Sequence, residues 1–160
     1  RTITVFTTYF SPYWEYGGTV RSIDGLVRQL LLQGDNVTVL TTAPDLLWEQ
    51  YDQALNYPGK LSIKYYLLPG RFKFSIKYFF RSIRETACSD IVYVNGLWTW
   101  PSVSGVFLAS IFKKRLILAP RGMLLKPALA YNEKIKKYFI RIYYIDSSKK
   151  VIMVLTNNKF

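Results

Sequence analysis

Two loops of this 160-residue chain carry residue types that bind phosphates and sugar rings. Asn95 and Trp98 follow one apolar run, while Arg121 and Gly122 follow another, with Lys126 close behind. An arginine can hold a phosphate through two parallel hydrogen bonds, and a glycine beside it lets the backbone approach the ligand closely. A tryptophan beside a helix start can stack on a sugar ring or contact an apolar lipid segment. These residues predict a binding site for a phosphorylated or sugar-like ligand.

A third loop, between the first predicted strand and the first predicted helix, contains Gly17 and Gly18. Paired glycines let backbone amides approach a ligand at the positive end of a helix dipole, where a phosphate or carboxylate is favoured. The loop matches neither the GxGxxG dinucleotide motif nor the GxxxxGKS/T phosphate loop, so both assignments are excluded.

Each of these features also has a purely structural interpretation. The two glycines can form a tight turn, and Arg121 can pair with a nearby acid on the surface. Either tryptophan of the second loop can cap the hydrophobic core, although Trp98 is the better candidate for the site because it is nearer the strand end. The single cysteine, Cys88, is predicted to be a small core residue.

Six β-rich runs alternate with four helical patterns, which predicts a parallel sheet built from strand–helix–strand units. Most runs are continuous stretches of Val, Ile, Leu and Tyr, as expected for strands that are covered on both faces. The predicted strands are 2–8, 36–42, 61–68, 90–94, 115–119 and 151–156, and the predicted helices are 20–33, 75–87, 102–112 and 132–146.

The predicted fold is therefore α/β: a Rossmann-like, open, twisted sheet of about six mostly parallel strands with helices on both faces. Ligands of such sheets bind beyond the carboxyl ends of the strands, so the loops opened by Gly17, Asn95 and Arg121 are expected to converge along one rim. Residues 1–160 are predicted to form one domain, in which residues 43–60 make an irregular connection. Few residues follow the final predicted strand, which suggests that this domain belongs to a larger protein.

The net charge of +12 is distributed unevenly along the chain. Residues 1–58 hold three basic and six acidic side chains, a net charge of −3, whereas residues 59–160 hold nineteen and four, a net charge of +15. The second part is expected to attract phosphates, on a nucleic acid, an anionic membrane surface or a sugar nucleotide.

Two segments of the basic part suit an anionic membrane surface, with an ordinary solvated helix face as the alternative. In residues 71–84, basic and aromatic side chains alternate. In the later predicted helix, the face opposite the apolar stripe carries Lys134, Lys136, Lys137 and Arg141. No run approaches the ~20 apolar residues of a membrane span, and no secretory signal is recognisable. With one cysteine and no histidine, we expect no disulfide, no metal and a cytoplasmic location.

Several segments, in order, resemble the N-terminal domain of the retaining glycosyltransferases of family 4, which have the GT-B fold. The resemblance covers nearly all of the chain, and its last two segments are similar to enzymes that build bacterial surface polysaccharides. The matching segments are Ser11–Pro12 with the glycine loop, 30–34 leading into 37–40, 96–98 with 101–102, and 120–124 with 127–129.

This resemblance implies transfer of a sugar from a nucleotide-sugar donor to a glycan or lipid-linked acceptor, with retention of the anomeric configuration and without a metal or other cofactor. It implies that this domain holds the acceptor and that an absent C-terminal domain holds the nucleotide. It places Gly18 near the donor diphosphate, Asn95 and Trp98 along the cleft, and Arg121 opposite a phosphate. The expected location is the cytoplasmic, inner face of the plasma membrane, as a peripheral protein.

The chain departs from that family in two ways. Asn95 stands where members often have histidine, and an amide forms hydrogen bonds but does not shuttle a proton near neutral pH. The C-terminal domain with its paired glutamates is missing, so we expect the isolated chain to be catalytically silent, since the transition state needs a closed cleft. The alternative function is a non-enzymatic α/β domain that binds an anionic membrane or polyanion; no motif for specific nucleic-acid binding is present.

Overall fold

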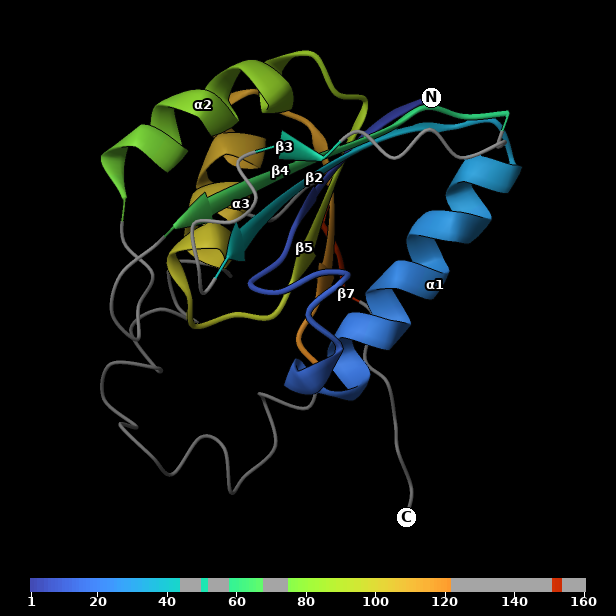
Figure 1. The fold of residues 1–160 in the computed structure, drawn as a ribbon. Coiled ribbons are helices and arrows are strands. Elements are labelled where there is room, and N and C mark those ends of the chain that lie inside the picture. Colours follow the sequence, from blue (N-terminus) through green and yellow to red (C-terminus); the bar gives the residue numbers. More distant parts are fainter. Residues whose placement is uncertain (44–49, 52–57, 68–74, 122–150, 154–160) are drawn as a thin grey trace.

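The computed structural model describes residues 1–43, 50–51, 58–67, 75–121 and 151–153 (Figure 1). The described strands form one seven-stranded sheet in the order β3-β4-β2-β1-β5-β6-β7. Every neighbouring pair is parallel except β3 and β4, which are antiparallel. The strands are β1 (Thr2–Phe6), β2 (Asn36–Ala43), β3 (Gln50–Tyr51), β4 (Leu61–Leu67), β5 (Ile91–Asn95), β6 (Arg115–Ala119) and β7 (Val151–Met153).

Helices cover both faces of this sheet, as predicted. Helix α1 (Gly18–Leu32) lies on one face, and helices α2 (Ile76–Ala87) and α3 (Trp100–Ile111) lie side by side on the other (Figure 1). The Rossmann-like, mostly parallel α/β fold expected from the sequence is therefore confirmed. The helix predicted over 132–146 lies outside the described residues. No described helix has both the length and the apolar character that crossing a membrane requires.

Two local predictions were wrong. The connection predicted to be irregular contains β3, in which Gln50 pairs with Lys64 of β4; a two-residue strand is too short to show an alternating pattern. Cys88 is exposed rather than part of the core. It occupies the C-cap of α2, just beyond the last turn of the helix that packs on the sheet.

Two hydrophobic cores hold these layers together. Consecutive strand residues point to opposite faces, so Val5 belongs to the core beneath α1 whereas Phe6 belongs to the core beneath α2 and α3. On the second face, α3 approaches β1 and β5 closely at Gly105. A Cβ added there would lie 2.7 Å from Cγ of Phe6 and 2.9 Å from Cγ2 of Val94, which only glycine avoids.

The strand order reverses between β1 and β5. From the central β1 the chain builds outward through β2 and β4, then returns to the other side of β1 and builds outward through β5, β6 and β7. Open α/β sheets bind ligands beyond the carboxyl ends of the strands at such a reversal. The carboxyl ends of β1 and β5, at the lower edge in Figure 1, are therefore where a site is expected.

Candidate functional site

The side chain of Arg121, which follows β6, binds residues of β5 and of α1. Its Nε donates a hydrogen bond of 2.7 Å to Oδ1 of Asn95 at the end of β5. Its Nη1 donates a hydrogen bond of 2.7 Å to the hydroxyl of Ser22 near the start of α1, and its Nη2 donates one of 3.3 Å to the hydroxyl of Tyr93. The end of β5, the start of α1 and the residue that follows β6 thus meet at one rim of the sheet.

The backbone of Arg121 is itself unusual. Its φ of 53° lies in the left-handed region, which costs a residue with a Cβ about 1–2 kcal/mol. Such a conformation persists where the surrounding contacts impose it, and the three hydrogen bonds of the guanidinium supply those contacts. Gly122 and Lys126, the other predicted residues of this loop, lie outside the described residues.

Asn95 bridges the reversal of the strand order. It is only 7% exposed, and its Nδ2 donates a hydrogen bond of 3.1 Å to the hydroxyl of Thr7, directly after β1. That hydroxyl in turn donates one of 3.1 Å to the carbonyl of Tyr9. Since its Oδ1 accepts from Arg121, both ends of the Asn95 amide are engaged, and they link the carboxyl ends of β1, β5 and β6. We call Thr7, Ser22, Tyr93, Asn95 and Arg121 the rim network.

A second string of hydroxyl groups runs beside the rim network. The hydroxyl of Thr8 lies 2.9 Å from that of Thr99, which lies 3.2 Å from that of Ser102. Sequence reasoning missed these residues, together with Thr7, Ser22 and Tyr93. The only signal that could have found Thr7 and Thr8 was their position, directly after the central strand of a doubly wound sheet.

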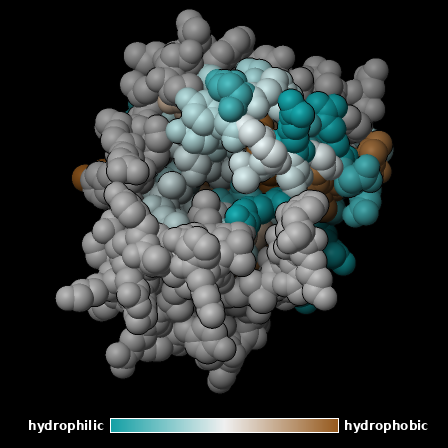
Figure 2. Space-filling view, turned by 90° about the horizontal axis from the view of Figure 1, so that it is seen from below, coloured by the Kyte–Doolittle hydropathy of each residue, from teal (hydrophilic) through white to brown (hydrophobic). Residues whose placement is uncertain are grey.

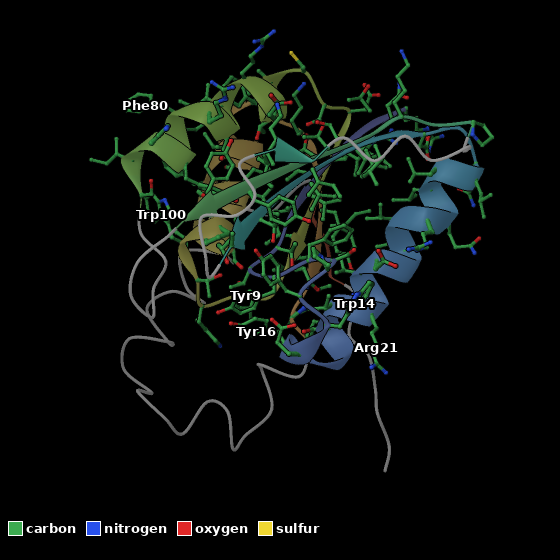
Figure 3. The ribbon with its side chains drawn as sticks, viewed as in Figure 1. Tyr9, Trp14, Tyr16, Arg21, Phe80 and Trp100 are labelled. Atoms are coloured by element: carbon green, nitrogen blue, oxygen red, sulfur yellow. The ribbon has the colours of Figure 1, made fainter. Side chains whose placement is uncertain are left out.

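The loop between β1 and α1 presents aromatic rings and backbone amides at the same edge. The rings of Tyr9 and Tyr16 stack with centroids 3.6 Å apart, and the side chain of Trp14 is also partly exposed. Gly17 has a φ of 89°, so glycine is needed there whether or not a ligand binds, and no side chain of the described residues caps α1 at Gly18. Figure 3 shows the aromatic side chains beside the start of α1.

The two tryptophans of the second loop pack inside the domain. Trp98 is partly buried against the core beneath α2 and α3. The indole Nε1 of Trp100 donates a hydrogen bond of 2.9 Å to the carbonyl of Ser75, the N-cap of α2. These contacts agree with the core-capping interpretation, and a role for Trp98 in binding stays a prediction.

The rim network favours binding of an anion over proton transfer. Burial raises the pKa of Tyr93, and the neighbouring Arg121 opposes this only in part, so the phenol is protonated at neutral pH. A guanidinium has five N–H donors, and its hydrogen bonds to described residues use three of them; the other two are suited to a phosphate or sugar oxygen. The network contains no carboxylate, and the described residues hold no cluster of three or more potential metal ligands.

The described part of the surface at this edge is mainly polar. Viewed from below in Figure 2, the coloured residues are mainly teal to white, with smaller brown, hydrophobic areas between them and at the margins. Hydroxyl, amide and guanidinium groups suit a ligand that is itself rich in hydroxyl or phosphate groups.

No protein-family model matches the chain, and no curated protein matches it. Among solved structures, one that matches is described as showing the single-stranded DNA binding mode of DNA processing protein A from Helicobacter pylori. It has 15% sequence identity and a TM-score of 0.45, and the match covers 88% of this chain and 79% of that chain. A likeness this distant carries no argument about function.

Proposed function

We propose that this chain is the acceptor-side, N-terminal domain of a retaining glycosyltransferase with the GT-B fold, of the family 4 type that builds surface polysaccharides. The complete enzyme would transfer a sugar from a nucleotide-sugar donor to a glycan or lipid-linked acceptor. It would act as a peripheral protein at the cytoplasmic face of the plasma membrane.

One observation carries this proposal: the rim network joins the loops after β1, β5 and β6 at the reversal of the strand order. These are the loops that carry the sequence resemblance. In a closed enzyme they would form one wall of a cleft, and the nucleotide-binding domain would form the other.

The roles of the individual groups follow from their chemistry. The two remaining N–H groups of Arg121 are suited to a phosphate of the donor or acceptor, because a guanidinium forms strong, directional hydrogen bonds to oxyanions. Backbone amides at the start of α1 would add donors near Gly18, at the positive end of the helix dipole. Because Asn95 has both ends of its amide engaged within the domain, we assign it the role of positioning Arg121 rather than moving a proton.

The proposal is tested by completing the enzyme. The chain is produced with a C-terminal nucleotide-binding domain of a family 4 glycosyltransferase, and sugar transfer and donor hydrolysis are measured with a panel of uridine and guanosine diphosphate sugars. We expect activity with at least one donor, and at least about tenfold less with Arg121→Ala, since removal of a preorganised charged donor costs on the order of 3 kcal/mol in the transition state. Arg115→Ala, an exposed arginine at the opposite end of β6, is the matched control. Inactivity with every donor, or equal activity of Arg121→Ala and the control, would overturn the assignment.

A second candidate function is a non-enzymatic α/β domain that binds an anionic surface. The observation that favours it is an exposed apolar and basic surface on α2 and α3, away from the rim network. The assay with the panel of sugar nucleotides distinguishes the two functions, because only a glycosyltransferase turns over a sugar nucleotide.

A further inference from the structure

Helices α2 and α3 share an exposed apolar strip, formed by Ile76, Phe80, Phe107 and Ile111. These side chains are 60, 66, 50 and 54% exposed, respectively, although each is large and hydrophobic. The ring of Phe79, between the helices, has its centroid 6.2 Å from that of Phe80 and 6.1 Å from that of Phe107. Ile76 precedes Phe80 by four residues on α2, and Ile111 follows Phe107 by four residues on α3, so each pair lies on one helix face. The four exposed residues thus form one surface, which we call the apolar strip.

The two helices are held side by side in the same direction. At their N-terminal ends the indole of Trp100 donates to the carbonyl of Ser75 at 2.9 Å, and at their C-terminal ends Nζ of Lys114 donates to the carbonyl of Ala87 at 2.8 Å. Because both ends are tied together, the strip is preorganised. In Figure 3 Phe80 lies on the side of α2 that faces away from the sheet.

Basic side chains border the apolar strip. Lys77 and Arg84 are exposed on α2, and Lys113 is exposed just after α3. Within the described part of the chain, no ion pair involves any of these three residues. Arg81 is also exposed, but its side chain lies against Tyr66 of β4. Glu85, the single acid of α2, points away from the border, where it pairs with Lys64 of β4 at 2.5 Å. The border thus has an unbalanced positive charge.

We propose that the apolar strip and its basic border dock this domain onto an anionic lipid bilayer. In this arrangement α2 and α3 lie parallel to the membrane, the isoleucine and phenylalanine side chains enter the boundary between headgroups and acyl chains, and the basic side chains contact anionic headgroups. If the proposed function is correct, this surface supplies the residues that hold the enzyme at the membrane. Binding of the surface to a bilayer does not itself require sugar transfer.

Two other occupants fit the surface less well. A two-fold dimer would bring the basic borders of both copies together, and four side chains cover much less than the ~800 Å² that each partner of a stable interface buries. A single-stranded nucleic acid would match the charge, but it binds through base stacking on aromatic rings. Ile76 and Ile111 offer neither a ring nor a hydrogen bond, whereas both fit an acyl environment.

The docking surface begins next to the rim. Thr99, whose hydroxyl lies 2.9 Å from that of Thr8, is the N-cap of α3, and Trp100 is the first residue of that helix. A bilayer held against α2 and α3 would therefore lie beside the carboxyl edge of the sheet. If the proposed function is correct, this brings a lipid-linked acceptor to the same edge of the sheet as the rim network.

The test measures binding of the 160-residue chain to vesicles without donor or acceptor, so that its outcome is independent of transfer activity. Sedimentation is compared for vesicles of phosphatidylcholine alone and with about one-third phosphatidylglycerol. We expect binding to the anionic vesicles. It should be at least about tenfold weaker for Phe80→Ser/Phe107→Ser. It should be about fivefold weaker for each charge removed in Lys77→Gln/Arg84→Gln. The control is Leu32→Ser on α1, which removes a side chain of similar exposure, 53%, from the other face of the sheet.

A second readout uses Cys88, the single cysteine, which is exposed at the C-terminal end of α2. A polarity-sensitive dye attached there should shift to the blue with anionic vesicles, and circular dichroism checks that each variant is folded. The proposal is overturned by equal binding to neutral vesicles, or by binding that the strip variants leave unchanged. It is also overturned if the strip variants only dissociate a dimer, seen by light scattering, or only weaken binding to a single-stranded oligonucleotide.

Discussion

Replacing Arg121 with alanine is expected to lower the free energy of unfolding by about 2–3 kcal/mol, at ~1 kcal/mol for each of the three hydrogen bonds lost. Its bond to Asn95 should contribute most, because Asn95 is only 7% exposed and its Oδ1 would lose a short partner at 2.7 Å. The bond to Ser22 should contribute least, since that side chain is exposed. Urea unfolding, followed by tryptophan fluorescence and circular dichroism, measures the change.

Replacing Arg121 with glycine separates the contribution of its side chain to stability from the cost of its backbone conformation. Arg121→Gly loses the same hydrogen bonds, but glycine adopts a φ of 53° without a clash. We therefore expect it to be about 1 kcal/mol more stable than Arg121→Ala. Arg115→Ala, at an exposed position in β6, should change the free energy of unfolding by less than about 0.5 kcal/mol and serves as the control.

A double-mutant cycle with Asn95→Ala isolates the central hydrogen bond, and the expected coupling energy is about 1 kcal/mol. The reasoning is refuted if Arg121→Ala behaves like the Arg115 control. It is also refuted if the alanine and glycine variants are equally stable, because the left-handed backbone would then carry no cost.

Two further predictions concern packing and ionisation. Gly105→Ala should destabilise the domain by about 1–3 kcal/mol, because the added Cβ would lie 2.7 Å from Phe6. Gly25→Ala in α1, where an added Cβ meets no atom within 4 Å, should stabilise it by about 0.5–1 kcal/mol; similar urea midpoints for the two variants would contradict this account. Burial raises the pKa of Tyr66 from 10.0 to about 12, so its contribution to stability is complete below pH 10 and is lost as the pH rises toward 12. Between about pH 10 and 12, the free energy of unfolding of Tyr66→Phe, measured in urea, should therefore fall less steeply than that of the unsubstituted protein. Identical pH dependence of the two proteins would argue against the raised pKa.

The order of strands and helices could be predicted from the sequence because their patterns are local. Continuous apolar runs such as 115–119 indicate a strand covered on both faces, and β6 has those bounds. The stripe of Ile23, Leu26, Val27, Leu30 and Leu31 indicates the face of α1 that packs on the sheet. Ile23, Val27 and Leu31 are buried there, and Leu26 and Leu30 are partly buried. Because β1, β5 and β6 are parallel, the loops that follow them lie at one edge of the sheet.

The partners within that edge were not predictable in the same way. Thr7, Ser22 and Tyr93 are far from Arg121 in the sequence, and nothing in their neighbours distinguishes them from other polar residues near strands. The exposure of Cys88 and the presence of β3 were not predictable for a related reason. A single residue at a helix end and a two-residue strand are too short to show a periodic pattern of apolar residues.

The amino-acid sequence by itself determined the fold class, the helix faces and the three loops of the rim, because each depends on spacing within a short segment. Only the tertiary structure decided that Arg121 binds Asn95 and Ser22, and that Phe80 and Phe107 share one exposed surface. Those contacts join residues from separate elements, and their distances depend on how the helices pack on the sheet. The same packing leaves α2 and α3 with an apolar face that neither helix reveals when considered alone.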